Sequence, residues 1–206
     1  EARGRLTQLR ARRDFLAHTR EEMDGFYAGV RSVMQARIAG VLGPVASHIT
    51  VPPELEQALE TALGSHLQDL IVERWEVAEK AIEHLKRVQG GRATFLPLDT
   101  LRPSSPLEVP AEPGVIGLAS QLIQYEARLQ PAVELLLNRT LVVEDLKTAR
   151  RVMERLRGGF TIVTRAGEIV RSSGSVTGGA GAGERQAGMM AREREWRVLP
   201  TQVTAA

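Results

Sequence analysis

Two segments of the chain share one pattern of apolar and polar positions, 71 residues apart. Residues 70–72 and 141–143 are short apolar runs, and each continues into a stretch with the periodicity of an amphipathic helix. Each copy also has an apolar helical segment before the run and a further apolar run after it: residues 55–63 and 93–98, then 131–137 and 160–164. Because short apolar runs that alternate with helices form α/β units, the pattern predicts an α+β core of two pseudo-repeated α/β subdomains.

The segment between the two copies is rich in proline. Residues 102–114 contain four prolines, and proline fits neither a helix interior nor a central strand. We therefore predict a linker at residues 102–114, which separates a first subdomain at residues 25–101 from a second at residues 115–183.

The spacing of apolar side chains predicts a helical arm at each end of the chain. In the N-terminal arm, residues 1–24, they recur every seven residues and continue into the core, at Leu9, Leu16, Met23 and Val30. The C-terminal arm, residues 184–206, has 4-3-4 spacing at Arg192, Trp196, Leu199 and Val203. Pro200 interrupts that spacing, and would lie in a first turn or kink the helix. We predict the stubs of an antiparallel coiled coil; the alternative is two ordinary amphipathic helices packed on the core.

Composition limits the class of protein. The chain has 206 residues, 43% of them apolar, which suffices for one sizeable core or two small ones. No apolar run approaches the roughly 20 residues that cross a bilayer, and the lack of cysteine excludes disulfides and thiolate metal sites. We expect a globular protein of the cytoplasm without membrane contact. Because both ends are charged and helix-like, we also expect a piece of something longer.

Charge is nearly balanced overall, at +2, but it is unevenly placed. Residues 1–37 contain eight arginines against five acids, whereas residues 38–183 contain fifteen basic and seventeen acidic residues. The core is therefore not a basic nucleic-acid-binding module. Any attraction to DNA phosphates is expected on the arms, where it would be independent of sequence and sensitive to salt.

Glycines gather at residues 173–179, after an alternating apolar run and before the C-terminal arm. Several glycines beside a strand allow another backbone to approach closely. We therefore predict a dimer interface at Gly174, Ser175, Val176, Thr177, Gly178 and Gly179. The alternative is that the segment only forms a loop that leads into the C-terminal helix.

Three other segments form an ordered set of motifs with residues 173–179: residues 25–31 (GFYAGVR), 90–99 (GGRATFLPLD) and 140–149 (TLVVEDLKTA). Together with residues 173–179 they resemble the hinge domain of prokaryotic structural maintenance of chromosomes (SMC) proteins, in a match that runs from about residue 25 to residue 179. The resemblance implies a doughnut-shaped homodimer, in which strands of neighbouring chains add edge to edge.

The resemblance also implies an architectural role. Such a hinge joins two SMC arms into a ring or V shape in a nucleoid-associated machine that condenses or segregates chromosomes. The ATPase heads are absent from this chain, so we expect no catalysis and no cofactor here, and kleisin-type subunits only at those heads. Candidate DNA contacts at the junction of hinge and coil are Arg31 and Arg37. Residues 180–185 (AGAGER) lack the lysine cluster of some family members, which argues against strong DNA binding.

A second class of function is a nucleotide- or metabolite-binding regulatory α/β domain that uses the glycine loop at residues 178–183. That loop lacks the Gly-Lys-Ser/Thr ending of a P-loop. Residues 40–45 form an incomplete GxGxxG interrupted by Pro44, and we predict a turn there before a strand at residues 46–51. The four histidines lack metal-ligand spacing, and we interpret Glu144-Asp145 as a strand-to-helix cap. The sequence therefore predicts no catalytic or metal site.

Overall fold

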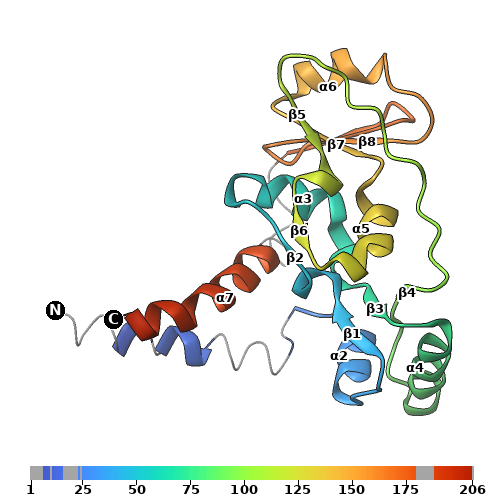
Figure 1. The fold of residues 1–206 in the computed structure, drawn as a ribbon, viewed down its shortest axis with the longest axis vertical. Helices are drawn as coiled ribbons and strands as arrows, with labels where there is room; N and C mark the ends of the chain where they lie inside the picture. Colours follow the sequence, from blue (N-terminus) through green and yellow to red (C-terminus); the bar gives the residue numbers. More distant parts are fainter. Residues whose placement is uncertain (1–6, 10, 16–22, 24, 180–187, 206) are drawn as a thin grey trace.

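The computed structural model describes residues 7–9, 11–15, 23, 25–179 and 188–205 (Figure 1). The first half contains α2 (Ala28–Gln35), β1 (Val41–Pro44), β2 (Ile49–Thr50), α3 (Glu56–Leu63), β3 (Leu70–Val72), α4 (Trp75–Val88) and β4 (Phe95–Pro97). The second half contains β5 (Val115–Leu118), β6 (Gln124–Tyr125), α5 (Gln130–Leu137), β7 (Thr140–Val143), α6 (Leu146–Met153), β8 (Thr161–Thr164), β9 (Ile169–Arg171) and β10 (Val176–Thr177), and α7 (Met189–Ala205) follows it. Short 3-10 helices complete the connections: η1 (Val45–Ser47), η2 (Pro53–Leu55), η3 (Gly64–Gln68), η4 (Ala119–Gln121) and η5 (Ala127–Leu129).

The predicted repeat is confirmed. The apolar runs at residues 70–72 and 141–143 form β3 and β7, and each is followed by its helix, α4 or α6. β3 lies between antiparallel β1 and parallel β4, just as β7 lies between antiparallel β5 and parallel β8. The parallel pairs follow from the crossover helices, which return the chain to the same end of the sheet.

One local prediction is wrong. Residues 41–44, expected in a turn, form the strand β1, and the strand expected at residues 46–51 is reduced to the 3-10 helix η1 and the two residues of β2. Gly43 has a φ of +130°, and the pairing of β1 with β3 shifts its register there, so the glycine forms a bulge and not a turn. Pro44 is tolerated because it ends a strand at the edge of its sheet.

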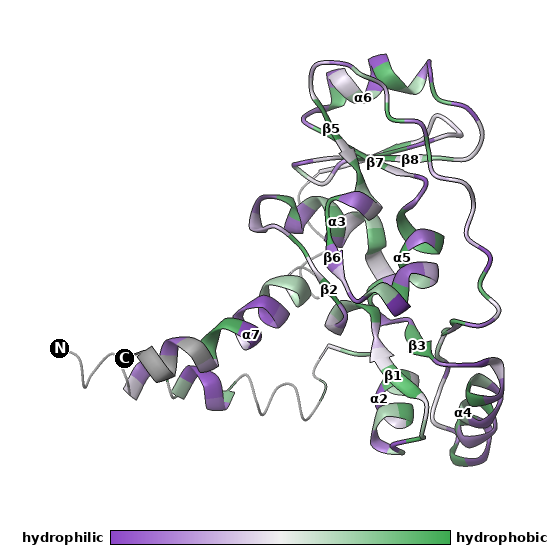
Figure 2. Ribbon diagram, viewed as in Figure 1, coloured by the Kyte–Doolittle hydropathy of each residue, from purple (hydrophilic) through white to green (hydrophobic). Residues whose placement is uncertain are grey.

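The two halves share one core. α3 of the first half packs against β8 of the second, and the α5 residues Val133 and Leu137 face Val45 and Ile71 of the first. β2 pairs antiparallel with β6 between the halves. Figure 2 shows the apolar residues of β3, β7 and β8 inside this arrangement. The repeat therefore forms an intertwined pair with α3 and α5 exchanged, and the subdomain boundaries drawn from the sequence stay predictions.

The proline-rich segment, residues 102–114, runs along the outside of both halves without helix or strand (Figure 1). It is nevertheless attached to the second half, because Leu107 is buried and its N–H donates to the carbonyl oxygen of Asn138 at 2.8 Å. Glu112 adds an ion pair with Arg151, at 2.9 Å between Oε2 and Nε.

The two terminal helices lie side by side (Figure 1). Residues 7–9 and 11–15 are helical, and Arg12 contacts Glu195 of α7 through two hydrogen bonds of 2.7 and 2.8 Å. The predicted heptad does not continue into the core: Met23 has a φ of 50°, and Val30 is buried inside α2. Leu16 lies outside the described residues. Pro200 lies inside α7 and not in its first turn.

Candidate dimerisation surface

The glycine-rich segment forms one strand of a hairpin at the end of the five-stranded sheet. β9 and β10 pair antiparallel, with Val170 opposite Val176. The N–H of Arg171 donates to the carbonyl oxygen of Ser175 at 3.0 Å across the turn. Gly174 has a φ of +86°, the left-handed conformation that favours glycine. The strand order is β10-β9-β8-β7-β5, so the outer side of β10 has no strand partner within the described chain.

All six residues predicted for the interface lie together on this hairpin and are exposed. Val176 is 60% exposed, more than any other large apolar side chain that the structure describes. A Cβ on Gly174 or Gly179 would meet no atom within 4 Å, although both have positive φ; a Cβ on Gly178 would lie 2.8 Å from Cγ of Glu168. Contacts inside the chain therefore leave this strand edge and its apolar Val176 uncovered.

A second open edge lies in the first half. The three-stranded sheet has the order β1-β3-β4, so β4 is paired on one side only. The backbone that precedes β4 lies close against α2. A Cβ on Gly29 of α2 would lie 2.0 Å from the carbonyl oxygen of Arg92, and a Cβ on Gly91 would lie 3.2 Å from the nitrogen of Gly29. The sequence singled out residues 25–31 and 90–99 as separate motifs. It did not predict that they contact each other, since only the fold brings them together.

The repeat explains why the two edges differ. β4 and β8 occupy the same place in their sheets, next to β3 and β7. In the second half β9 lies on the outer side of β8, whereas the corresponding side of β4 carries no strand in the described part of the chain. Because an edge strand presents unpaired N–H and C=O groups, β4 can accept a strand from another chain.

The predicted DNA contacts lie elsewhere, in and just after α2. Arg31 is half-buried and donates a hydrogen bond to the carbonyl oxygen of Phe26. Arg37 is exposed and follows the helix with a φ of 48°. In Figure 1, α2 lies beside β1 and apart from α7. Both arginines stay candidate DNA contacts. A contact between Arg31 and a DNA phosphate would compete with the hydrogen bond from Arg31 to Phe26.

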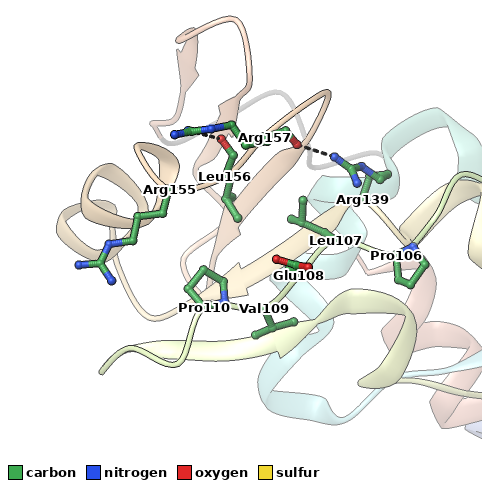
Figure 3. Close-up of a pocket in the computed structure, with 9 residues that line it drawn as sticks. All are labelled: Pro106, Leu107, Glu108, Val109, Pro110, Arg139, Arg155, Leu156 and Arg157. Atoms are coloured by element: carbon green, nitrogen blue, oxygen red, sulfur yellow. Dashed lines mark hydrogen bonds between the residues drawn. The ribbon is translucent and has the colours of Figure 1, made fainter.

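A hollow of about 540 Å³ lies between the linker and the end of α6 (Figure 3). Its charged lining consists of Glu108, Arg139, Arg155 and Arg157. The arginines do not converge on the space: Arg139 donates to the carbonyl oxygens of Arg157 and Gly159 at 2.7 and 2.8 Å, and Arg155 pairs with Glu112. These side chains hold the linker and the turn between α6 and β8, so we assign no ligand to the hollow.

The predicted cap at the start of α6 is confirmed. The Asp145 carboxylate accepts the N–H of Thr148 at 2.8 Å, and this bond lowers the pKa of Asp145. From residue 180 onward, the glycine loop of the nucleotide hypothesis lies outside the described residues. Within the described ranges, no group of three or more potential ligands could hold a metal ion, and no helix is long and apolar enough to span a membrane.

Comparison with known proteins decides the family. Residues 38–153 match the family model of the SMC proteins flexible hinge domain. The chain belongs to the SMC hinge family. This hinge is 39% identical to the Chromosome partition protein Smc of Myxococcus xanthus over 98% of its length, and 34% identical to that of Bacillus subtilis over 92%. It spans only 17% and 16% of those two proteins.

Solved structures agree with the fold. The hinge resembles the crystal structure of an asymmetric dimer of the Geobacillus stearothermophilus SMC hinge domain, with a TM-score of 0.90 and 33% identity. That match covers 99% of this chain and 84% of the other. The Pyrococcus furiosus SMC hinge domain matches with a TM-score of 0.64 and 31% identity, over 82% of this chain and 88% of that one. The α+β hinge-type fold expected from the sequence is therefore confirmed.

Proposed function

We propose that this hinge dimerises and thereby joins two SMC arms into a ring or V shape, as part of a Smc chromosome partition protein. Three observations support this role: the names of its relatives, the dimer formed by the Geobacillus hinge, and two terminal helices that leave the core side by side. The parent protein would be a nucleoid-associated ATPase of the cytoplasm that condenses and segregates chromosomes. This domain would contribute shape and association, and its heads and kleisin-type partners would lie elsewhere.

The interface that we propose pairs β10 of one protomer with β4 of its partner. The observation that carries it is the unequal ending of the two sheets: the second half has an extra hairpin, and in the described residues the first half lacks a strand at the equivalent position. A two-fold axis would repeat the contact and close a ring. Each three-stranded sheet would then continue into the five-stranded sheet of the partner chain.

The test is the oligomeric state of a variant that changes only the strand edge. Val176→Asp places a charge where two backbones would meet, and an unpaired buried charge costs several kcal/mol, on the order of 3–5. Because Val176 is 60% exposed within one chain, the fold of the protomer should survive. We expect light scattering to show a dimer for the unchanged hinge and a monomer for Val176→Asp. The double replacement of Gly178 and Gly179 by bulky residues should also give a monomer, but a side chain at Gly178 would in addition press on Glu168 inside the chain, so that variant counts only if its fold is intact by circular dichroism.

The matched control is Val109→Asp, which changes an equally apolar side chain, 41% exposed, on the linker. This variant should remain a dimer. A folded Val176→Asp protein that still has the mass of a dimer would place the interface elsewhere.

The nucleotide-binding alternative has its own test. The loop at residues 178–183 has no lysine and no following hydroxyl to hold phosphate and metal, so titration calorimetry with ATP should give no heat of binding. Micromolar binding that disappears when Gly181 and Gly183 are replaced would instead favour a regulatory domain.

A further inference from the structure

The C-terminal helix is attached to the core by a buried carboxylate. Glu60 of α3 is only 9% exposed, and its two oxygens accept the N–H groups of Met189 at 2.7 Å and of Gly188 at 3.0 Å. N–H groups at the start of a helix have no partner within the helix, and a negative charge there also interacts favourably with the helix dipole. Met189 and Met190 are themselves buried in the shared core.

Further contacts fix the course of α7 along its next turns. Arg194 donates to the carboxylate of Glu56 at 2.6 Å, again on α3. Arg197 donates to the main-chain carbonyl oxygens of Ser47 and Ile49, at 2.8 and 3.0 Å. The first turns of α7 therefore follow α3 and η1, and α7 in turn holds the N-terminal helical residues through the Arg12–Glu195 pair.

Helix α3 also contacts the sheet that ends in β10. α3 packs on β8, and Nε2 of Gln57 donates to the carbonyl oxygen of Ala166, in the turn between β8 and β9, at 2.8 Å. α3 thus lies between the C-terminal arm and the strands that lead to the proposed interface.

The repeat shows that packing alone does not require this carboxylate. Glu134 is the fifth residue of α5, as Glu60 is the fifth residue of α3. Glu134 is partly exposed, and its Oε1 accepts a hydrogen bond from Gln130 on the same helix, at 2.7 Å. Burial of the charged Glu60 carboxylate is costly. Desolvation raises the pKa of Glu60, although the backbone N–H groups of Gly188, Met189 and Met190 act to lower it. A buried charge with no counterpart in the other half indicates a task other than filling space.

We propose that Glu60 is a positioning residue that locks the start of α7 to α3, and so sets the direction of the arm relative to the sheet that carries β10. The inference rests on the proposed function, because it concerns the angle at which the arms leave the hinge. Without the carboxylate, the first turn of α7 would lose two hydrogen-bond acceptors and the arm would sample several directions.

The experiment measures arm direction within one chain. The chain contains no cysteine, so Val198→Cys on α7 and Glu154→Cys after α6 introduce a unique pair of exposed labelling positions. Spin labels on this pair, diluted with unlabelled protein, report the distance between arm and core by pulsed EPR, whether or not the hinge dimerises. We expect one narrow distance distribution for the otherwise unchanged hinge, a broad or shifted one for Glu60→Ala, and an intermediate one for Glu60→Gln, whose amide keeps one acceptor.

The matched control is Glu134→Ala, which should keep the narrow distribution. If Glu60→Ala folds and keeps it too, the proposal is wrong. If Glu60→Ala does not fold, Glu60→Gln decides by hydrogen exchange: at least one of the amides of Gly188 and Met189 should exchange about tenfold faster or more, and unchanged exchange of both overturns the proposal.

Light scattering of the same samples separates this inference from the function on which it rests. A monomeric hinge with a narrow arm distance contradicts the proposed dimer but not the role of Glu60. A dimer whose arm distance does not depend on Glu60 contradicts the positioning role alone.

Discussion

Residues 41–97 of the first half and residues 115–164 of the second half pass through the same order of strands and helices, yet the sheets of the two halves end differently. In the first half the sheet stops at β4. In the second it continues through β9 to β10, whose apolar edge is exposed. In the proposed dimer, two similar halves with unequal ends would make a surface that is complementary to itself, which one repeat alone could not provide.

The interiors of the two halves are joined, whereas their sheet edges are separate. Helices α3 and α5 are exchanged, so the largest buried cluster contains residues from both halves. The halves should therefore behave as one cooperative unit in folding, even though we propose different roles for them in association.

The largest effect that we expect tests whether the two halves unfold together, with one replacement in the separate buried cluster of each half. Leu70 and Leu141 are equivalent residues of β3 and β7, and both are 0% exposed. Replacing either by alanine should lower the free energy of unfolding by about 2–5 kcal/mol, because it removes buried methyl groups and leaves a cavity. Urea unfolding, followed by circular dichroism and by tryptophan fluorescence, should show a single coincident transition in each variant. Separate transitions for the two halves would break the comparison.

A second test concerns charge, with a smaller expected effect. The two halves differ in charge, because α6 contains three basic residues and no acid, whereas the charges of α4 cancel. We nevertheless expect weak, sequence-independent DNA contact near α2, at Arg31 and Arg37. Charge reversal at Arg31 and Arg37 should weaken binding and reduce the slope of log affinity against log salt by about one unit per charge. Fluorescence anisotropy at low salt measures this.

The controls for DNA binding are reversals on the core at Arg92, Arg128 and Arg139, in proteins whose fold is intact by circular dichroism, because Arg139 also holds the turn between α6 and β8. If these abolish binding while reversal at Arg31 and Arg37 leaves it unchanged, the junction is not the site. Reversal at Lys147 and Arg150 on α6 additionally shows whether the basic helix of the second half contributes.

The smallest effect is a pH dependence confined to the first half. His66 pairs with the buried carboxylate of Asp69 at 2.7 Å, and this bond raises the pKa of His66 above 6.5. The residue equivalent to Asp69 is Thr140, so the second half lacks the pair. The charged pair therefore stabilises the fold fully below pH 6.5, and this contribution is lost as pH rises through the higher pKa of the folded state.

Thermal unfolding between pH 5.5 and 8.5 measures this contribution. Because the His66 side chain is 56% exposed, we expect no more than about 0.5 kcal/mol. His66→Gln should flatten the pH dependence, and an equally steep curve in that variant would rule out the pair as its source.

Much of the fold was predictable because its signals are local. The apolar runs of β3 and β7, the Asp145 cap and the exposed glycine strand each depend on residues close together in the sequence. The turn expected at residues 40–45 failed because Gly43 suits a bulge as well as a turn, and only the pairing with β3 distinguishes the two. The heptad does not continue into the core as far as Val30, because periodicity does not say whether an apolar face meets another helix or the core.

The sequence by itself determined the repeat, the SMC hinge resemblance and the segment proposed for dimerisation, since periodicity, motif order and glycine content can be read along the chain. Only the tertiary structure decided that α3 and α5 are exchanged, that β4 lacks the neighbour that β8 has, and that Glu60 is buried while Glu134 is not. These features depend on contacts between distant residues, such as Glu60 and Met189, which are 129 positions apart. The same local pattern therefore folds twice, and the tertiary contacts around each copy decide which strand edges and side chains it exposes.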